Sequence, residues 1–541
     1  MNTTNIIFTI ICAVICIGVF IPQLRSKCKI KNSEKIYLAA IILIIALAVI
    51  IRVYKFGSVP GGINQDGAMA GVDAKALAEY GTDRLGMRYP VHFTAWGFGQ
   101  MSVLMSYMMI PFIKIMGLNA ISLRLPTLLV SLAGLALLYL FCRDAFGKWH
   151  ALAVLFIAAI SPWHIMQSRW ALDCNLLPHF FIAAVYFLYR AIKCNRQMLN
   201  LAVSMVLFGL CMYCYGISIY TVTLFLFIAC IWLLFSKRIS FKRAAAAFII
   251  YIAVAWPFIM CMAINALGGE SIETSLFTIP YFPNTLRSSD ILFFADNIPE
   301  QFLSNLKCTF RIIFQTYGDS LSNMIPGFGT LYVFSVPFIL LGFIYCIAQC
   351  RKNEASILIM IFFLVGIIDG AITKNVNVNR LNLIFYPLII FCGMGIYISI
   401  DKLRYAALIP TAIMYLAVFC VFTNIYFTTY ADEISDVFLK DFGQALTSLK
   451  DSDVEKIYIT PDSQFSGASY VSEILTLYYQ DIDAQYFCSS DYNSRYIYKN
   501  VSEDDIQENA AYVVGELSAM MFDANEYNII KFGRFYAITP K

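Results

Sequence analysis

One aspartate lies beside an apolar segment, where its carboxylate could take up a proton. The polar stretch VPGGINQDGAMAGVDAKALAEYGTDRLGMRYPVHFTAWGFGQM covers residues 59–101 and places Asp66 a few residues after an apolar segment. A carboxylate at the membrane edge loses water on one side, and such carboxylates can serve as general bases. Residues 68–80 predict an amphipathic helix lying on the surface. The alternative interpretation of Asp66 is a solvated or capping residue.

A second polar cluster occurs in SPWHIMQSRWALDCNLLPHFF, residues 161–181. It contains Arg169, Asp173 and Asn175 beside long apolar runs. Charges near hydrocarbon are costly unless they are paired or hydrated, so these residues are expected to have a structural or functional role. They predict either a functional site or an ion pair between Arg169 and Asp173, which are four residues apart and could pin a helix end.

A third polar patch, AITKNVNVNRLNLIFYPL, separates two apolar segments at residues 371–388. Lys374 and Arg380 lie here among asparagines 375, 377, 379 and 382. Cationic and amide donors clustered at an interface suit a phosphate oxygen. The alternative is an interfacial turn whose long side chains snorkel toward water.

The elements that must position these residues are membrane helices. The chain has 541 residues, 60% hydrophobic and 14% charged, with a mean hydropathy of +0.69. A soluble protein carries about 25% charged residues, so that class is excluded. The net charge of +4 does not suggest a nucleic-acid partner. Apolar segments long enough for helices lie near 4–22, 36–54, 97–116, 120–141, 149–165, 175–193, 198–214, 216–235, 244–264, 330–350, 355–373, 382–399 and 406–428.

The positive loops orient these segments. Short loops rich in Lys and Arg stay in the cytoplasm, and the loops concerned contain Arg25, Lys27, Lys29, Lys31 and Lys35, then Lys237, Arg238, Lys242 and Arg243, then Arg351 and Lys352, then Lys402 and Arg404. Residues 56–96, 265–329, 374–381 and those after 430 are then predicted to lie outside. The run 149–165 is broken by Pro162 and predicts a partial helix, so the topology of 97–173 stays open.

The last part of the chain changes character. VEKIYIT, AQYFCSS, NAAYVVGEL and KFGRFYAITP predict strands, and SGASYVSEILTLYYQ predicts a helix. The sequence therefore predicts two domains: an all-α polytopic membrane domain of about 12 to 13 helices at 1–431, and a small extracytoplasmic α/β domain at 432–541.

The combination resembles the GT-C glycosyltransferases, above all the bacterial enzymes similar to protein mannosyltransferases and aminoarabinose transferases. The residues that carry the resemblance are NQDG around Asp66, MGLNAISLRLP at 116–126 and SPWHIMQSRWALDCN at 161–175. It covers residues 36 to about 430, while the tail matches only in position and size. The chain departs from the family where mannosyltransferases carry Asp-Glu, because Gly67 follows Asp66 here.

The resemblance implies transfer of a sugar from a polyprenyl-phosphate carrier to an acceptor hydroxyl outside the membrane, with inversion. Asp66 matches the loop aspartate taken as the catalytic base, and Asp173 matches the later acidic position of the second outer loop. Asp173, Asn175, His92 and Gln100 are together candidates for the acceptor, the sugar or this second acidic position. Where relatives have a His-Pro-Pro or Glu-Lys-Pro element, this chain offers His92 and Gln100. A divalent cation, Mg²⁺ or Mn²⁺, is a further expectation. The donor phosphate is predicted to bind Arg169 as the first candidate, Arg380 as the second and Lys374 as the third.

A transporter or flippase of a lipid-linked envelope precursor is the alternative function. Such proteins show repeated halves and interrupted helices that meet at mid-membrane. This chain has no evident repeat, and its ionisable residues gather at the predicted outer edge. We therefore expect an enzyme of the cell membrane whose partners are a polyprenyl-phosphate sugar, the bilayer and an envelope acceptor, either a protein, a glycolipid or a polysaccharide.

Overall fold

The computed structural model describes residues 2–24, 33–96, 99–282, 292, 297–461 and 469–541. The chain divides into two compact units. The helical unit comprises 1–54, 127–256 and 287–428, and the mixed unit comprises 55–126, 257–286 and 429–541. Four of the predicted cytoplasmic cations, Arg25, Lys27, Lys29 and Lys31, lie outside the described residues.

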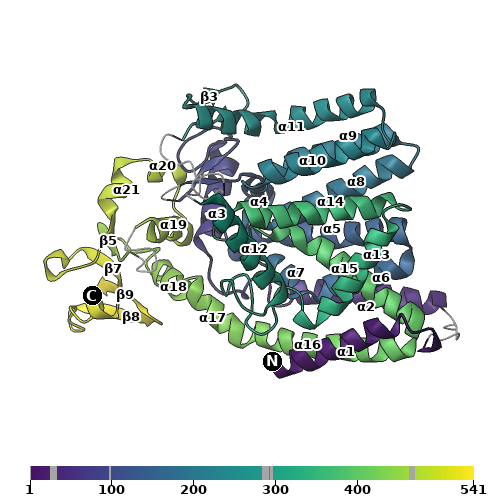
Figure 1. Ribbon diagram of the computed structural model, residues 1–541. Coiled ribbons are helices and arrows are strands. Elements are labelled where there is room, and N and C mark those ends of the chain that lie inside the picture. The colour runs from purple at the N-terminus through teal and green to yellow at the C-terminus, as the bar shows by residue number, and fades with distance from the viewer. Residues whose placement is uncertain (1, 25–32, 97–98, 283–291, 293–296, 462–468) are drawn as a thin grey trace. The chain divides into compact units, whose positions relative to one another are not determined.

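Long apolar helices dominate the chain (Figure 1). Within the described ranges, 8 helices are long and apolar enough to cross a membrane: α2 (Ser33–Val53), α5 (Ala120–Phe146), α8 (Leu177–Lys193), α10 (Ser218–Phe235), α11 (Phe241–Leu267), α14 (Glu354–Ile372), α15 (Phe385–Leu403) and α16 (Tyr405–Phe427). The shorter apolar helices are α1 (Asn2–Gly18), α4 (Leu104–Met116), α6 (Lys148–Ile160), α9 (Gln197–Cys211) and α13 (Val336–Gln349). Each overlaps one predicted apolar segment, which confirms a polytopic helical fold.

The predicted break at Pro162 is present. Helix α6 ends at Ile160, and α7 (Pro162–Gln167) begins after Ser161, whose backbone is extended. Proline lacks the N–H that would continue the first helix, but it fits the first turn of a new one. The Ser161 side chain accepts a hydrogen bond from the His164 backbone N–H and caps α7. The break therefore ends α6 after 13 residues.

Glycines set the separation between two central helices of the helical unit. A Cβ on Gly342 of α13 would collide with the carbonyl oxygen of Phe391 on α15. A Cβ on Gly395 of α15 would likewise collide with the carbonyl oxygen of Phe338 on α13. Small residues allow membrane helices to approach this closely and gain van der Waals contact. Helix α12 (Ile298–Phe314), which packs on α14, was not predicted.

The mixed unit begins with α3 (Gln65–Tyr80), which packs against α4. The prediction of an amphipathic surface helix at 68–80 was wrong. The helix starts at Gln65, and almost every residue from Gly67 to Leu77 is buried, because small side chains on all its faces let neighbouring elements approach. The strands β1 (Phe93–Thr94) and β2 (Gln100–Met101) form a hairpin. Strand β2 lies within the apolar segment 97–116, for which a helix was predicted. Strand β3 (Ile272–Glu273) pairs with β4 (Thr278–Ile279).

The tail, which ends in yellow in Figure 1, holds a five-stranded sheet in the order β6-β5-β7-β9-β8. Its strands are β5 (Lys456–Ile459), β6 (Tyr496–Tyr498), β7 (Ala510–Gly515), β8 (Tyr527–Phe532) and β9 (Phe535–Pro540). Strand β5 is parallel to β6 and β7, whereas β9 is antiparallel to β7 and β8. The accompanying helices are α17 (Thr429–Val437), α18 (Lys440–Ser448), α19 (Tyr470–Tyr479), α20 (Ala484–Phe487), α21 (Ser490–Arg495) and α22 (Glu516–Ala519).

The small α/β domain is thus confirmed, with one wrong element. The segment AQYFCSS was predicted as a strand but forms α20. The side chain of Asp483 accepts hydrogen bonds from the backbone N–H groups of Gln485 and Tyr486, which caps a helix start. Residues 466–468 of the predicted helix lie outside the described residues, and the helix is described from Tyr470.

Candidate active site

Asp66 lies in the first turn of α3, in the mixed unit. Its residue is half-buried, and its Oδ1 accepts a hydrogen bond from the Trp96 indole N–H at 2.6 Å. Trp96 follows β1, so the β1–β2 hairpin supplies the group that orients the carboxylate. A carboxylate at a helix N-terminus also lies near the positive end of the helix dipole. Asp66 is therefore an oriented, accessible anion.

Arg124 holds the loop that leads to Asp66. This arginine of the RLP sequence is buried, and its Nη2 donates a hydrogen bond to the Gly62 carbonyl oxygen at 2.9 Å. Its Nη1 donates to the Phe56 carbonyl oxygen at 3.3 Å. Both bonds join the start of α5 to residues just before α3. Arg124 thus acts on the backbone that precedes the candidate base.

A buried ion pair fixes the other end of the same loop. Arg84 Nη1 lies 2.7 Å from Asp73 Oδ2, and both side chains are almost fully buried. Arg84 Nη2 also donates to the Thr94 carbonyl oxygen at 2.9 Å, which connects α3 to β1. Neighbouring Asp83 accepts backbone N–H bonds from Leu85 and Met87. Burial, and next the charge of Asp73, raise the pKa of Asp83 to about 7.

The other two predicted residues of this unit flank the hairpin. His92 is buried, with its ring 5.5 Å from Phe258 and 6.1 Å from Phe282 between centroids. Gln100 pairs with Thr94 across the hairpin. Its Nε2 is buried and has no hydrogen-bond partner among the described residues. Gln100 therefore offers an amide donor from the hairpin that orients Asp66.

Arg169 of the helical unit is fully buried. Its Nη1 donates to the carbonyl oxygens of Ile51 at 3.1 Å and Arg52 at 2.7 Å, at the C-terminal end of α2. Its guanidinium carbon lies 5.1 Å from the ring centroid of Phe427. Cations stabilise helix C-termini because unpaired carbonyls point outward there. One established role of Arg169 is therefore to cap α2.

Asp173 and Asn175 form a short 3₁₀ turn ahead of α8. The carboxylate of Asp173 accepts the backbone N–H of Cys174 at 2.7 Å, and Asn175 Nδ2 donates to the carbonyl oxygens of Gln167 and Trp170. Asn382 Nδ2 donates to the Cys174 carbonyl oxygen at 3.1 Å. The fold thereby brings the second and third polar clusters of the sequence together.

Lys374 and Arg380 occupy one turn between α14 and α15, and both are half-exposed. The Arg380 guanidinium donates to the backbone carbonyl oxygen of Lys374, so it closes the turn on which both residues lie. Asp319, which the sequence analysis did not single out, accepts the backbone N–H of Val378 in this turn. Burial raises the pKa of Asp319, although its hydrogen bonds act in the opposite direction.

A buried polar chain in the helical unit was also missed. Arg52 Nη2 lies 3.0 Å from His164 Nδ1, His164 Nε2 lies 3.2 Å from the Tyr386 hydroxyl, and this hydroxyl lies 2.6 Å from His179 Nδ1. Arg52 also donates to the carbonyl oxygens of Ala158 and Ala159 at the end of α6. The only sequence signal was an arginine and two histidines inside apolar runs.

The predicted divalent cation has no evident ligand set. The described residues contain no group of three or more His, Cys, Asp or Glu side chains placed to hold a metal ion. The sequence predicted no specific ligands for it. The cation therefore stays a prediction, which a chelator titration of transfer activity tests.

Comparison with known proteins finds one matching family. The sequence model of the family described as dolichyl-phosphate-mannose-protein mannosyltransferase matches residues 101–264. No curated protein matches the sequence significantly.

Solved structures match over nearly the whole chain. The apo structure of ArnT from Cupriavidus metallidurans is 11% identical and has a TM-score of 0.58, covering 93% of this chain and 98% of that one. The same protein bound to undecaprenyl phosphate is 10% identical, with a TM-score of 0.56 over 92% and 97%. The oligosaccharyltransferase of Archaeoglobus fulgidus with Zn and sulfate is 11% identical, with a TM-score of 0.51 over 93% and 73%. These likenesses show a shared fold.

Proposed function

We propose that this chain is a GT-C glycosyltransferase. In this proposal it moves a sugar from a polyprenyl-phosphate carrier to an alcohol outside the membrane. The observation that carries the proposal is the likeness to ArnT over 93% of this chain. That relative has been solved with undecaprenyl phosphate bound. The family-model match over 101–264 supports the same reaction class.

Asp66 is the general base in this proposal. Its carboxylate takes the proton of the acceptor hydroxyl while the acceptor oxygen attacks the anomeric carbon. The bond between that carbon and the phosphate oxygen breaks, and polyprenyl phosphate leaves with the electron pair. A single displacement of this kind inverts the anomeric configuration. The half-buried position and the Trp96 hydrogen bond support the assignment, because a base must be accessible and oriented.

Lys374 and Arg380 bind the donor phosphate in this proposal. Negative charge grows on the phosphate as the sugar departs, so positive groups there stabilise the transition state more than the ground state. We place both ahead of Arg169, because they are half-exposed whereas Arg169 is fully buried and donates to the α2 carbonyls. Arg169 then acts chiefly by fixing the end of α2.

The remaining predicted residues take supporting roles. Gln100 contributes an amide donor to the sugar or the acceptor, because its Nε2 has no partner among the described residues. Asp173 and Asn175 order the turn before α8 through backbone hydrogen bonds. His92 packs against two phenylalanine rings and supports the hairpin. The site and the tail domain face the extracytoplasmic side, as the positive-loop rule predicts.

The test supplies a synthetic polyprenyl-phosphate sugar and a panel of acceptors to the full chain in detergent. We expect free polyprenyl phosphate and an inverted glycoside to appear in equal amounts. A flippase would leave the donor intact, and that result would overturn the proposal. Comparing envelope glycans of cells with and without the gene then identifies the sugar and decides among protein, glycolipid and polysaccharide acceptors.

A further inference from the structure

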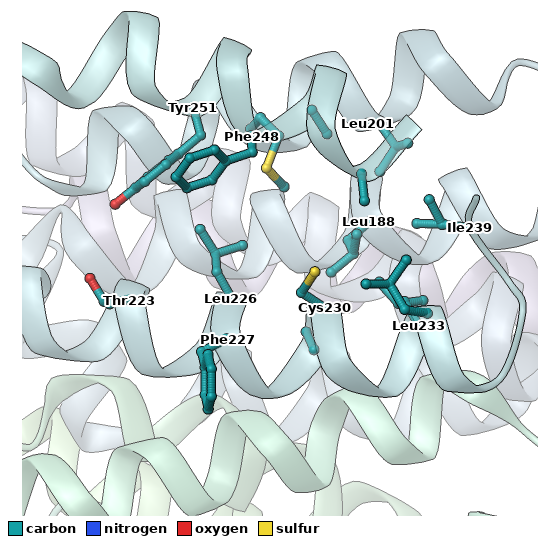
Figure 2. A pocket seen from close by; sticks show the side chains of 15 residues that line it. Leu188, Leu201, Thr223, Leu226, Phe227, Cys230, Leu233, Ile239, Phe248 and Tyr251 are labelled. Atoms are coloured by element: carbon teal, nitrogen blue, oxygen red, sulfur yellow. The ribbon is translucent and has the colours of Figure 1, made fainter. Parts of the chain in front are cut away.

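An apolar groove lies between α8, α9, α10 and α11, and none of the candidate site residues lines it. Its volume is about 310 Å³, and aliphatic and aromatic side chains of all four helices line it (Figure 2). In Figure 2 the groove extends from Thr223 and Tyr251 at one end to Ile239 at the other. Phe227 and Phe248 on its rim are 63% and 59% exposed, so it opens on the outside of the helical unit. Such a space suits hydrocarbon and excludes water.

Two exposed lysines lie close in sequence to the residues at one end of the groove. Leu234, Ile239 and Ala244 line the groove, and Lys237 and Lys242 lie within three residues of them in the sequence, both exposed. Nearby Arg238 is paired with Glu354 at 2.7 Å. The described residues give the side chains of Lys237 and Lys242 no hydrogen-bond or ion-pair partner. Two cations are therefore available to an anion at this end.

The positive end of the groove is opposite to the Lys374–Arg380 turn. Glu354, the first residue of α14, binds both Arg238 and Lys193. Lys374 lies two residues after the last residue of the same helix, which has 19 residues and is about 28 Å long. A phosphate at the positive end of the groove is therefore distinct from the sugar-carrier phosphate proposed at Lys374 and Arg380.

We infer that the groove binds one acyl chain of an anionic phospholipid whose phosphate lies against Lys237 and Lys242. The apolar lining accounts for the chain, and the two available lysines account for preference of anionic over zwitterionic headgroups. The positive-loop rule places this end in the cytoplasmic leaflet, where juxtamembrane Lys and Arg attract anionic lipids. The site is separate from sugar transfer and does not depend on that proposal.

Native mass spectrometry of the full chain in detergent tests the charge requirement. Phosphatidylglycerol and phosphatidylcholine with identical acyl chains are titrated separately. We expect tighter binding of phosphatidylglycerol, and a loss of about fivefold in its affinity for each of Lys237→Gln and Lys242→Gln. Lys35→Gln removes an exposed cation from another predicted cytoplasmic loop and is the matched control. Equal binding of the two lipids, or no effect of either lysine variant, would overturn the inference.

Filling the groove tests the acyl-chain requirement. Cys230 lines the groove and is exposed, so Cys230→Trp occupies the space without forcing a larger side chain into the helix core. We expect it to abolish the phosphatidylglycerol adduct. Cys420→Trp, at an exposed position on α16, should leave the adduct intact. If Cys230→Trp instead removed bound undecaprenyl phosphate and spared phosphatidylglycerol, the occupant would be the sugar carrier and the inference would be wrong.

Discussion

The loop around Asp66 and the turn around Lys374 both hold charges beside apolar helices, but they stabilise them differently. In the loop, the buried carboxylate of Asp73 is paired with the buried guanidinium of Arg84 at 2.7 Å. In the turn, the half-buried carboxylate of Asp319 accepts neutral N–H groups of Val378 and Ser320. Each region nevertheless contains a half-exposed charged residue, Asp66 in one and Lys374 with Arg380 in the other.

An acid can therefore order a site with or without a buried cation beside it. The free energy lost when the acid is removed differs between the two cases. Removing one member of a buried ion pair leaves an uncompensated charge. Removing a carboxylate that binds only N–H groups leaves neutral donors. The Asp66 loop should therefore be much more sensitive to loss of its structural acid than the Lys374 turn.

The largest effect is expected at Asp66. Asp66→Asn should lower the rate of transfer by about 100-fold or more, because an amide cannot take the acceptor proton. Expression, membrane insertion and thermal stability should be unchanged. Asp451→Asn, an exposed aspartate in the tail, is the control. Normal transfer by Asp66→Asn would falsify the assignment of the base.

The structural acids come next. Asp73→Ala should lower the free energy of unfolding by about 3 to 5 kcal/mol, since it leaves Arg84 buried and unpaired. Asp319→Asn should cost about 1 kcal/mol, because the amide oxygen still accepts an N–H. Denaturation of the detergent-solubilised variants measures both. The double variant Asp73→Leu with Arg84→Met should recover much of the loss; equal costs at residues 73 and 319 would contradict the comparison.

The cations of the turn should have an intermediate effect. Lys374→Gln and Arg380→Gln should each lower kcat/KM for the donor by about tenfold, the cost of one charged hydrogen bond to phosphate. Steady-state kinetics with varied donor measures this. Lys307→Gln, at an exposed position on α12, should leave the kinetics unchanged. If both variants behaved like Lys307→Gln, the phosphate would have to bind elsewhere.

The last effect is a dependence of stability on pH. The pKa of Asp83 is raised from 3.8 to about 7, so between these values the folded state binds its proton and the unfolded state does not. Stability from this group should therefore fall as pH rises from about 4 to about 7 and then become constant. The difference in melting temperature between the wild type and Asp83→Asn across this range isolates the effect. A difference that rises with pH would contradict the sign.

Hydrophobic length predicted the membrane helices because crossing hydrocarbon requires it whatever the neighbours are. For α3, amphipathic patterning predicted a helix over 68–80 but placed it on the surface, whereas small residues such as Gly71 and Ala74 permit burial on every face. Asp66 could be picked out because a charge at a membrane edge is unusual. Asp319 could not, because its partner Val378 is 59 residues away and its acceptor role depends on the fold.

The contact between α13 and α15 has a consequence for how this protein can vary. The atoms that Gly342 and Gly395 approach are carbonyl oxygens of the opposing backbone. Shortening a neighbouring side chain cannot create room for a methyl group there; only moving one helix away from the other can. Because α15 continues from the turn at Asn382, which hydrogen-bonds to Trp163 and Cys174, such a shift would be transmitted to the polar ends of the bundle. Natural variants should therefore tolerate change at the lipid-facing positions of these helices long before they tolerate an alanine at either glycine.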